Sequence, residues 1–423
     1  MIQRPVITGL GFITPIGNDR AGVVSSLREG RHGLSPVEFL GNPALPVKLA
    51  GTIKGFNVGS TDYRDWKWPA QYDFPRETLR SLAPHGVYAL CAAAQALAEA
   101  GLSNGIGDDE QTGLFCASAG SAMMLHHNLA QMHAVKGARG NPMGVVSSIC
   151  GTLNFALASH FRITGAVCGF VSACASSSHA LGYACDEIRL GRLKRVLVIG
   201  AEEDNAETIL PFAGMRALSA QSDPRAASRP FDIRRDGFVG AGGSVAIVLE
   251  SEESARERGA RIQAVFAGWG QGADGHSVSI SHPEGAGLRR AMERALKDAG
   301  VAPTEIDYVN AHATSTPIGD KAEITALHAT FTRGGAAPQV SSTKGLTGHP
   351  FSVSGIMEAA FCILAIDGRF VPGNHHLVDE DPSAAGLALP RSTVERDLRW
   401  VLNNSSGFGG SNVCQVFARP EPR

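Results

Sequence analysis

The sequence predicts an α/β protein made of two related halves, and three features of the chain support this. Apolar strand-like runs alternate with helical patterns along all 423 residues, which is typical of layered α/β folds. Each half opens with a strand that leads into a glycine-containing segment. Each half also ends on Gly-Phe, a glycine-rich turn and an alternating strand, at residues 237–250 and 407–419. We therefore expect the halves to comprise residues 1–255 and 256–423.

The elements of the first half follow from hydrophobic period and from glycine. Short apolar runs predict strands at residues 6–8, 113–118, 167–171, 195–200 and 238–250. Helical periodicity predicts helices at residues 19–28, 86–100, 123–135 and 145–161, and a further helix after residue 174. Gly9 and Gly11 are expected to form a turn after the first strand. Residues 31–75 and 217–236 are expected to be irregular.

The second half repeats the alternation. Strands are predicted at residues 262–267, 308–311, 340–342, 400–404 and 413–418, and helices at residues 287–299, 318–331 and 353–366. A glycine-rich loop is expected after the first of these strands. The whole chain therefore has enough strands and helices for two layered α/β halves.

Composition excludes several classes of protein. The chain is 43% hydrophobic with a net charge of −2, so a nucleic acid is not indicated as its main partner. None of the eight cysteines has C-x-x-C spacing, which predicts reduced thiols and a cytoplasmic protein. The N-terminus leads directly into a strand without the features of a signal peptide. No apolar run reaches the ~18 residues of a membrane span.

Cys174 is the first candidate for chemistry. A strand is predicted just before it, small residues surround it, and a helix follows through Ile188. The amides at a helix N-terminus favour negative charge, so a thiolate there is stabilised and the pKa of Cys174 is expected to fall. A small cysteine buried at a tight strand–helix crossing explains the same pattern. This stretch alone leaves both interpretations open.

Three further segments carry candidate residues. His312 follows a predicted buried strand, where a side chain faces a cleft between elements. Lys344 and His349 lie five residues apart in a loop of small residues, and Phe408 lies in the glycine loop at residues 403–412. Taken singly, each has an ordinary structural explanation. No metal site is expected, because no carboxylate or thiol completes a ligand set for the other histidines, which include His126, His127, His133, His375 and His376.

Together these segments resemble the β-ketoacyl-acyl-carrier-protein synthases of the elongating type I/II branch. The resemblance rests on V-I-T-G-L-G, V-S-A-C-A-S-S-S-H-A, R-P-F-D-I-R-R-D-G-F-V, N-A-H-A-T-S-T-P-I-G-D, S-T-K-G-L-T-G-H and G-F-G-G-S-N, in that order. The R-D-G-F-V-G-A-G-G-S form looks more like the type I synthases. The resemblance implies a thiolase-like, duplicated α-β-α-β-α sandwich that forms a homodimer.

The resemblance also implies roles for the candidate residues. Cys174 matches the nucleophile that receives an acyl group from the phosphopantetheine of acyl carrier protein, and the enzyme itself binds no cofactor or metal. His312 and His349 match the histidines that stabilise the enolate formed from malonyl-carrier. The backbone amides of Cys174 and Phe408 would hold the oxyanion. Supporting roles are implied for Lys344 and Glu358 beside the histidines, for Thr314 and Thr316 on the pantetheine arm, and for Phe408 as a gate.

Two positions depart from the family pattern. Ser406 stands where the family often has a second phenylalanine, which predicts a roomier acyl pocket or an altered gate. Gly120 aligns with a position that governs pocket depth, and a glycine there would not block a long chain. Because the carrier is acidic, basic residues are expected near the tunnel mouth. The candidates are Arg64, Lys67, Lys136 and Arg139.

The expected function is decarboxylative Claisen condensation in fatty acid chain elongation. Initiating synthases use Cys-His-Asn and thiolases Cys-His-Cys, and the histidine at position 349 argues against both. Two alternatives stay open: a ketosynthase of a specialised polyketide or polyene pathway, and a non-catalytic partner in a heterodimer. No nucleic-acid or membrane partner is expected.

Overall fold

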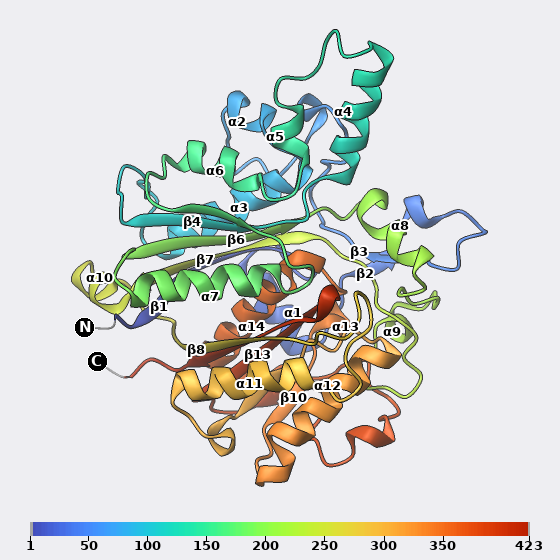
Figure 1. The fold of residues 1–423 in the computed structure, drawn as a ribbon, viewed down its shortest axis with the longest axis vertical. Coiled ribbons are helices and arrows are strands. Elements are labelled where there is room, and N and C mark those ends of the chain that lie inside the picture. Colours follow the sequence, from blue (N-terminus) through green and yellow to red (C-terminus); the bar gives the residue numbers. More distant parts are fainter. Residues whose placement is uncertain (1–2, 422–423) are drawn as a thin grey trace.

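The molecule is a stack of alternating helical and strand layers. The computed structural model describes residues 3–421. Figure 1 shows five layers along the long axis, in the order helices, strands, helices, strands, helices. The first half of the chain forms the upper layers and the second half the lower ones, with helices from both halves in the centre. This confirms the predicted α-β-α-β-α sandwich.

The strands of the two halves repeat one topology. The order is β5-β4-β6-β7-β1 in the first half and β10-β9-β13-β14-β8 in the second. In each half the first three strands of that order are parallel and the other two run antiparallel to their neighbours. The bounds are β1 (Pro5–Ile13), β4 (Thr112–Ala117), β5 (Val167–Phe170), β6 (Arg195–Glu202), β7 (Gly243–Ser251), β8 (Ala264–Ala273), β9 (Tyr308–Asn310), β10 (Gln339–Ser341), β13 (Trp400–Gly407) and β14 (Ser411–Ala418).

A short pairing joins the halves. Val6 and Ile7 of β1 pair with Val265 and Ala264 of β8, so the ten strands are continuous. The sequence similarity of residues 237–250 and 407–419 now has a structural meaning. It ends on β7 and β14, which occupy equivalent places in the two halves.

Apolar helices fill the central layer. α7 (Ser176–Arg189) and α14 (Ser354–Gly368) pack against each other between the strand layers. Among residues 3–421, 351–368 is the one helical stretch long and apolar enough to cross a membrane, yet 89% of it is buried inside the protein. It is a core helix, buried on every side, which explains why it lacks a polar face. The outer layers contain α3 (Pro84–Glu99) on one side, and α11 (Ala286–Ala299) and α12 (Pro317–Thr330) on the other.

The glycines near the start of each half lie inside strands and do not form turns. β1 runs through Gly9 and Gly11, and β8 runs through the predicted glycine loop. A Cβ on Gly11 would lie 1.8 Å from the carbonyl oxygen of Ala92 in α3, and one on Gly270 would lie 2.4 Å from that of Ala291 in α11. The predicted turns were therefore wrong, because these glycines let an outer helix approach the sheet.

Other predictions need correction in detail. The predicted helix at residues 145–161 is two helices, α5 (Gly144–Ser148) and α6 (Leu153–Phe161), separated by a turn in which Gly151 has φ +80°. The segments predicted to be irregular contain short elements. These and the remaining elements are α1 (Arg20–Glu29), β2 (Leu34–Pro36), β3 (Leu49–Gly51), α2 (Arg76–Arg80), α4 (Ala122–Ala134), α8 (Ala206–Gly214), α9 (Pro224–Ala227), α10 (Glu252–Glu257), α13 (Lys344–Thr347), β11 (Phe370–Val371) and β12 (Val394–Glu395).

The strand before Cys174 is not buried in the single chain. β5 lies at the edge of the sheet, and the side chains of Val167 and Val171 are 38% and 57% exposed. The apolar sequence alone predicted a buried strand, because composition does not distinguish an interior strand from an apolar edge. An apolar edge strand is a surface to which another strand can pair.

Candidate active site

Cys174 lies in a tight turn between β5 and α7. Ala175 caps the helix, so the cysteine comes two residues before the first helical residue. Ala173 has φ +50°, a backbone conformation that residues other than glycine rarely adopt. The amide of Ala175 donates to the carbonyl of Ser172 (3.2 Å). This strained turn presents the sulfur to the pocket, as strain at functional positions often does.

Burial controls the protonation of Cys174. It raises the pKa of the thiol to about 11, although the charge of Lys344 and the backbone amides of Phe408 and Cys174 oppose the rise. The expectation that the helix N-terminus lowers this pKa was wrong, because desolvation of a buried thiolate outweighs the favourable dipoles. The resting side chain is therefore a neutral thiol with two backbone amides directed at its sulfur.

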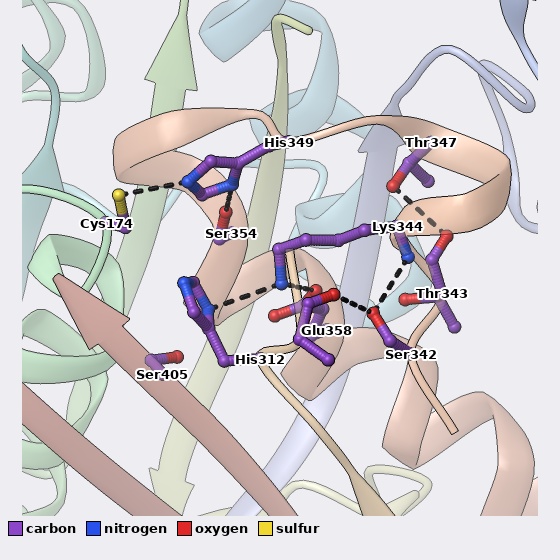
Figure 2. A network of polar contacts seen from close by, with 12 residues as sticks. Cys174, His312, Ser342, Thr343, Lys344, Thr347, His349, Ser354, Glu358 and Ser405 are labelled. Atoms are coloured by element: carbon purple, nitrogen blue, oxygen red, sulfur yellow. Dashed lines mark hydrogen bonds and ion pairs between the residues drawn. The ribbon is translucent and has the colours of Figure 1, made fainter. Parts of the chain in front are cut away.

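His349, two residues after α13, faces the sulfur. Its Nε2 lies 3.0 Å from Cys174 Sγ, and its Nδ1 lies 2.8 Å from Ser354 Oγ. Figure 2 shows the His349 ring with one contact to Cys174 and a second contact to Ser354. Phe238 packs edge-on against the ring, with the centroids 5.1 Å apart. Burial and the charge of Lys344 hold the pKa of His349 well below its usual range, so the ring is neutral.

His312 lies next to His349, two residues after β9. The two ring centroids are 5.4 Å apart at an angle of 83°. Lys344 Nζ is 3.3 Å from His312 Nδ1, and it also forms a short ion pair with Glu358 of α14. Burial, followed by the charge of Lys344, lowers the pKa of His312 well below its usual range. An ammonium can only donate, so it leaves the proton of a neutral His312 on Nε2.

Two residues of this network, Glu323 and Ser354, were not predicted from the sequence. Glu323 of α12 accepts from the backbone amides of His312 (3.0 Å) and Ala313 (2.7 Å), and it thereby fixes the segment that carries His312. Ser354 contacts the other histidine. The signal available in the sequence for Glu323 was an acidic residue in the middle of a predicted helix. No periodicity distinguishes Ser354 from the other small residues around it.

A pocket of about 510 Å³ opens onto these side chains. Its lining includes the predicted residues Cys174, His312, His349, Thr314, Thr316, Ser406 and Phe408. The Thr314 and Thr316 hydroxyls lie 3.1 Å apart, and Phe408 is 37% exposed beside the sulfur. Seven of the ten predicted site residues thus line this pocket. Lys344 and Glu358 lie behind the histidines and do not line the pocket.

Gly120 lies outside this lining. It has φ +83°, and a Cβ there would lie 2.6 Å from the amide nitrogen of Cys150. Contact with the 148–150 segment therefore requires glycine at this position. Its predicted influence on pocket depth stays a prediction.

The four predicted basic residues are exposed, and none of them lines the pocket. Arg64 forms a short ion pair with Asp62. Arg216 is the arginine that does line the pocket. The role of the four residues in binding a carrier stays a prediction.

The three central side chains also have the composition of a metal site. One ligand atom from each of Cys174, His312 and His349 lies within 4.8 Å of the others. A cation there would lie close to the buried ammonium of Lys344, which contacts His312 directly. This repulsion disfavours a metal and favours a reaction in which negative charge develops.

Family models match both halves of the chain. Residues 3–255 match the beta-ketoacyl synthase N-terminal domain, and residues 263–378 match the beta-ketoacyl synthase C-terminal domain. The chain belongs to the beta-ketoacyl synthase family. The resemblance drawn from the motifs is thus confirmed.

Full-length relatives agree with this assignment. The chain is 35% identical over 426 residues to 3-oxoacyl-[acyl-carrier-protein] synthase 1 of Haemophilus influenzae, covering 99% of each protein. A beta-ketoacyl synthase from Burkholderia phymatum superposes with a TM-score of 0.89 at 30% identity, over 99% of this chain and 100% of that one. The ishigamide ketosynthase/chain length factor superposes with a TM-score of 0.87 at 29% identity, over 100% of both chains.

Proposed function

We propose that this family member is a 3-oxoacyl-[acyl-carrier-protein] synthase of fatty acid chain elongation. It would join an acyl group on Cys174 to the two-carbon unit left when malonyl-carrier loses CO₂. The observation that carries this proposal is the convergence of Cys174, His312 and His349 on one pocket.

The first step would transfer the acyl group to Cys174. The sulfur attacks the thioester carbonyl of the acyl-carrier, the bond to the pantetheine sulfur breaks, and the thiol proton ends on that departing sulfur. The amides of Cys174 and Phe408, which are directed at the sulfur, would donate to the oxyanion. Thr314 and Thr316 on the pocket wall supply hydroxyls for the pantetheine amides.

The second step would form and use an enolate. Malonyl-carrier loses CO₂, and the electron pair moves onto its thioester oxygen. N–H donors from His312 and His349 stabilise that oxygen, because both rings are neutral and face the pocket. The enolate carbon then attacks the acyl-Cys174 carbonyl and the C–S bond breaks. The Cys174 sulfur takes up a proton from solvent to restore the thiol, and 3-oxoacyl-carrier leaves.

A second candidate function has support, and it differs from the first only in the acyl chain of the substrate. Ser406, on the pocket wall, is smaller than the phenylalanine expected there. A wider pocket also suits the longer or more rigid chains of a specialised polyketide or polyene pathway. The chemistry at Cys174 would be the same.

The proposed partners follow from the substrate and from the surface. An acyl carrier protein would present both substrates on its phosphopantetheine arm. A second copy of the chain would cover the apolar edge at β5, which gives the homodimer. Cytoplasmic location is supported by the cysteines, since all eight are free thiols.

The decisive experiment is intact-mass analysis of the enzyme offered acyl-carrier and then malonyl-carrier. Wild type is expected to gain the acyl mass and lose it when malonyl-carrier is added, with release of CO₂. Cys174→Ala should gain no mass. A wild-type enzyme that never acylates would instead favour the non-catalytic heterodimer partner.

A further inference from the structure

His312 and His349 differ in the group that contacts Nδ1 of the ring. Lys344 Nζ contacts Nδ1 of His312, whereas Ser354 Oγ contacts Nδ1 of His349. Ser354 is the first residue of α14, its side chain is fully buried, and this is the one hydrogen bond of its hydroxyl within residues 3–421.

The proposed function requires a defined tautomer of His349. A neutral imidazole carries one N–H, and only an Nε2–H can donate to a thioester oxygen in the pocket. Nδ1 must then accept a hydrogen bond. The Ser354 hydroxyl, at 2.8 Å, is the donor available for it.

The local backbone places Ser354 for this purpose. Phe351 has φ +44°, a conformation that residues other than glycine rarely adopt. Phe351 packs against the ring of His349 at 5.4 Å and stacks on Phe212 at 4.8 Å. This turn returns the chain beneath His349, so that α14 begins with its first side chain against Nδ1.

We propose that Ser354 is a positioning residue that donates to His349 Nδ1 and so holds the proton of His349 on Nε2. The inference rests on the proposed function and adds to it. Each histidine of the pair would have a donor of its own behind it, an ammonium for His312 and a hydroxyl for His349. Both Nε2–H groups then point at the same oxygen.

The test separates this role from packing. In Ser354→Ala, the rate of CO₂ release from malonyl-carrier should fall about tenfold, since one enolate donor is weakened. Ser354→Thr keeps the hydroxyl and should retain most of that rate. Ser244→Ala is the matched control, because it removes a buried hydroxyl whose one hydrogen bond within residues 3–421 is to the carbonyl of Gly200 (2.7 Å).

A direct readout is ¹⁵N NMR of histidine-labelled enzyme without substrate, where Nδ1 and Nε2 shifts report the tautomer. Wild type should show His349 protonated on Nε2, and Ser354→Ala should show a mixture of tautomers. Either His349 protonated on Nδ1 in wild type, or an alanine variant with unchanged tautomer and CO₂ release, would overturn the inference. Because the spectrum needs no substrate, an inactive wild type would refute the proposed function without being mistaken for this result.

Discussion

At the scale of single residues, the reactivity of Cys174 comes from its surroundings and not from an easily lost proton. Burial raises the pKa of its thiol to about 11, so the thiolate is scarce at neutral pH. Two amides and His349 Nε2 nevertheless face the sulfur. Donors placed in advance stabilise charge as it develops during the reaction, so the thiol does not need a low resting pKa.

This arrangement predicts the pH dependence of Cys174 alkylation. Only the thiolate reacts with iodoacetamide, and below the pKa its fraction rises tenfold for each pH unit. The labelling rate at Cys174 should therefore keep rising up to the highest pH at which the enzyme stays folded. Mass spectrometry of the Cys174 peptide measures it, with Cys174→Ala as the blank. A plateau reached below pH 8 would show that the thiol is acidic.

Ser406 predicts the acyl-length preference. Ser406→Phe adds a ring to the pocket wall and should shift the preferred acyl chain to shorter lengths, with a loss of about tenfold in the acylation rate for the longest chains, equivalent to ~1.4 kcal/mol in the barrier. Acylation of Cys174 by a series of saturated acyl-carriers, followed by intact mass, measures the profile. Ser406→Ala is the control, since it adds no bulk. An unchanged profile in the phenylalanine variant would contradict the prediction.

The sequence could predict the residues that lie in distinctive motifs. Cys174, His312 and His349 converge as expected, although they lie on three separate segments. The residues that support these three through hydrogen bonds could not be predicted in the same way. Ser354 and Glu323 act through hydrogen bonds whose partners depend on the strained turn at Phe351 and on the register of α12, and neither is encoded in local composition.

At the scale of elements, close approach of helix and strand explains the glycine-rich strands. β1 and β8 hold equivalent places in the two halves, and in each a glycine faces the backbone of an outer helix. The sequence indicated turns at these positions, since a glycine that permits a turn and one that permits close packing look alike. The strand and helix types were otherwise largely predictable from hydrophobic period.

Gly11→Ala tests this packing. Its Cβ would overlap the carbonyl of Ala92, so the variant should lose about 1–3 kcal/mol of unfolding free energy. Gly59→Ala is the matched control, because within residues 3–421 no heavy atom outside its chain neighbours lies within 4 Å of a Cβ there, and φ is not in the left-handed range. Urea unfolding followed by circular dichroism measures both variants. Equal stability of the two would show that the helix can shift away at little cost.

At the scale of the whole molecule, the duplication explains how the site is assembled. Cys174 follows β5 and His312 follows β9, so one comes from each half, and the halves meet through β1, β8 and the central helices. The duplication could be read from the sequence, because the two halves share an order of elements. The exposed edge at β5 could not, since it depends on which strand ends the sheet.

That edge predicts the oligomeric state. Exposed apolar side chains gather on β5, on the residue after it, and on the helices just before it, α5 and α6, and they include Val145, Phe155, Val167 and Val171. Two copies related by a twofold axis would pair their β5 strands antiparallel and bury these side chains.

Val167→Asp should therefore yield monomers, because it would bury two unpaired carboxylates, one from each copy, at the paired edge and weaken association by at least about a hundredfold. Val378→Asp, at an exposed valine between β11 and β12, should leave the dimer intact. Light scattering after size-exclusion chromatography measures the mass of each variant. A wild-type monomer would contradict the predicted dimer, and an aspartate variant at position 167 that stays dimeric would place the interface elsewhere.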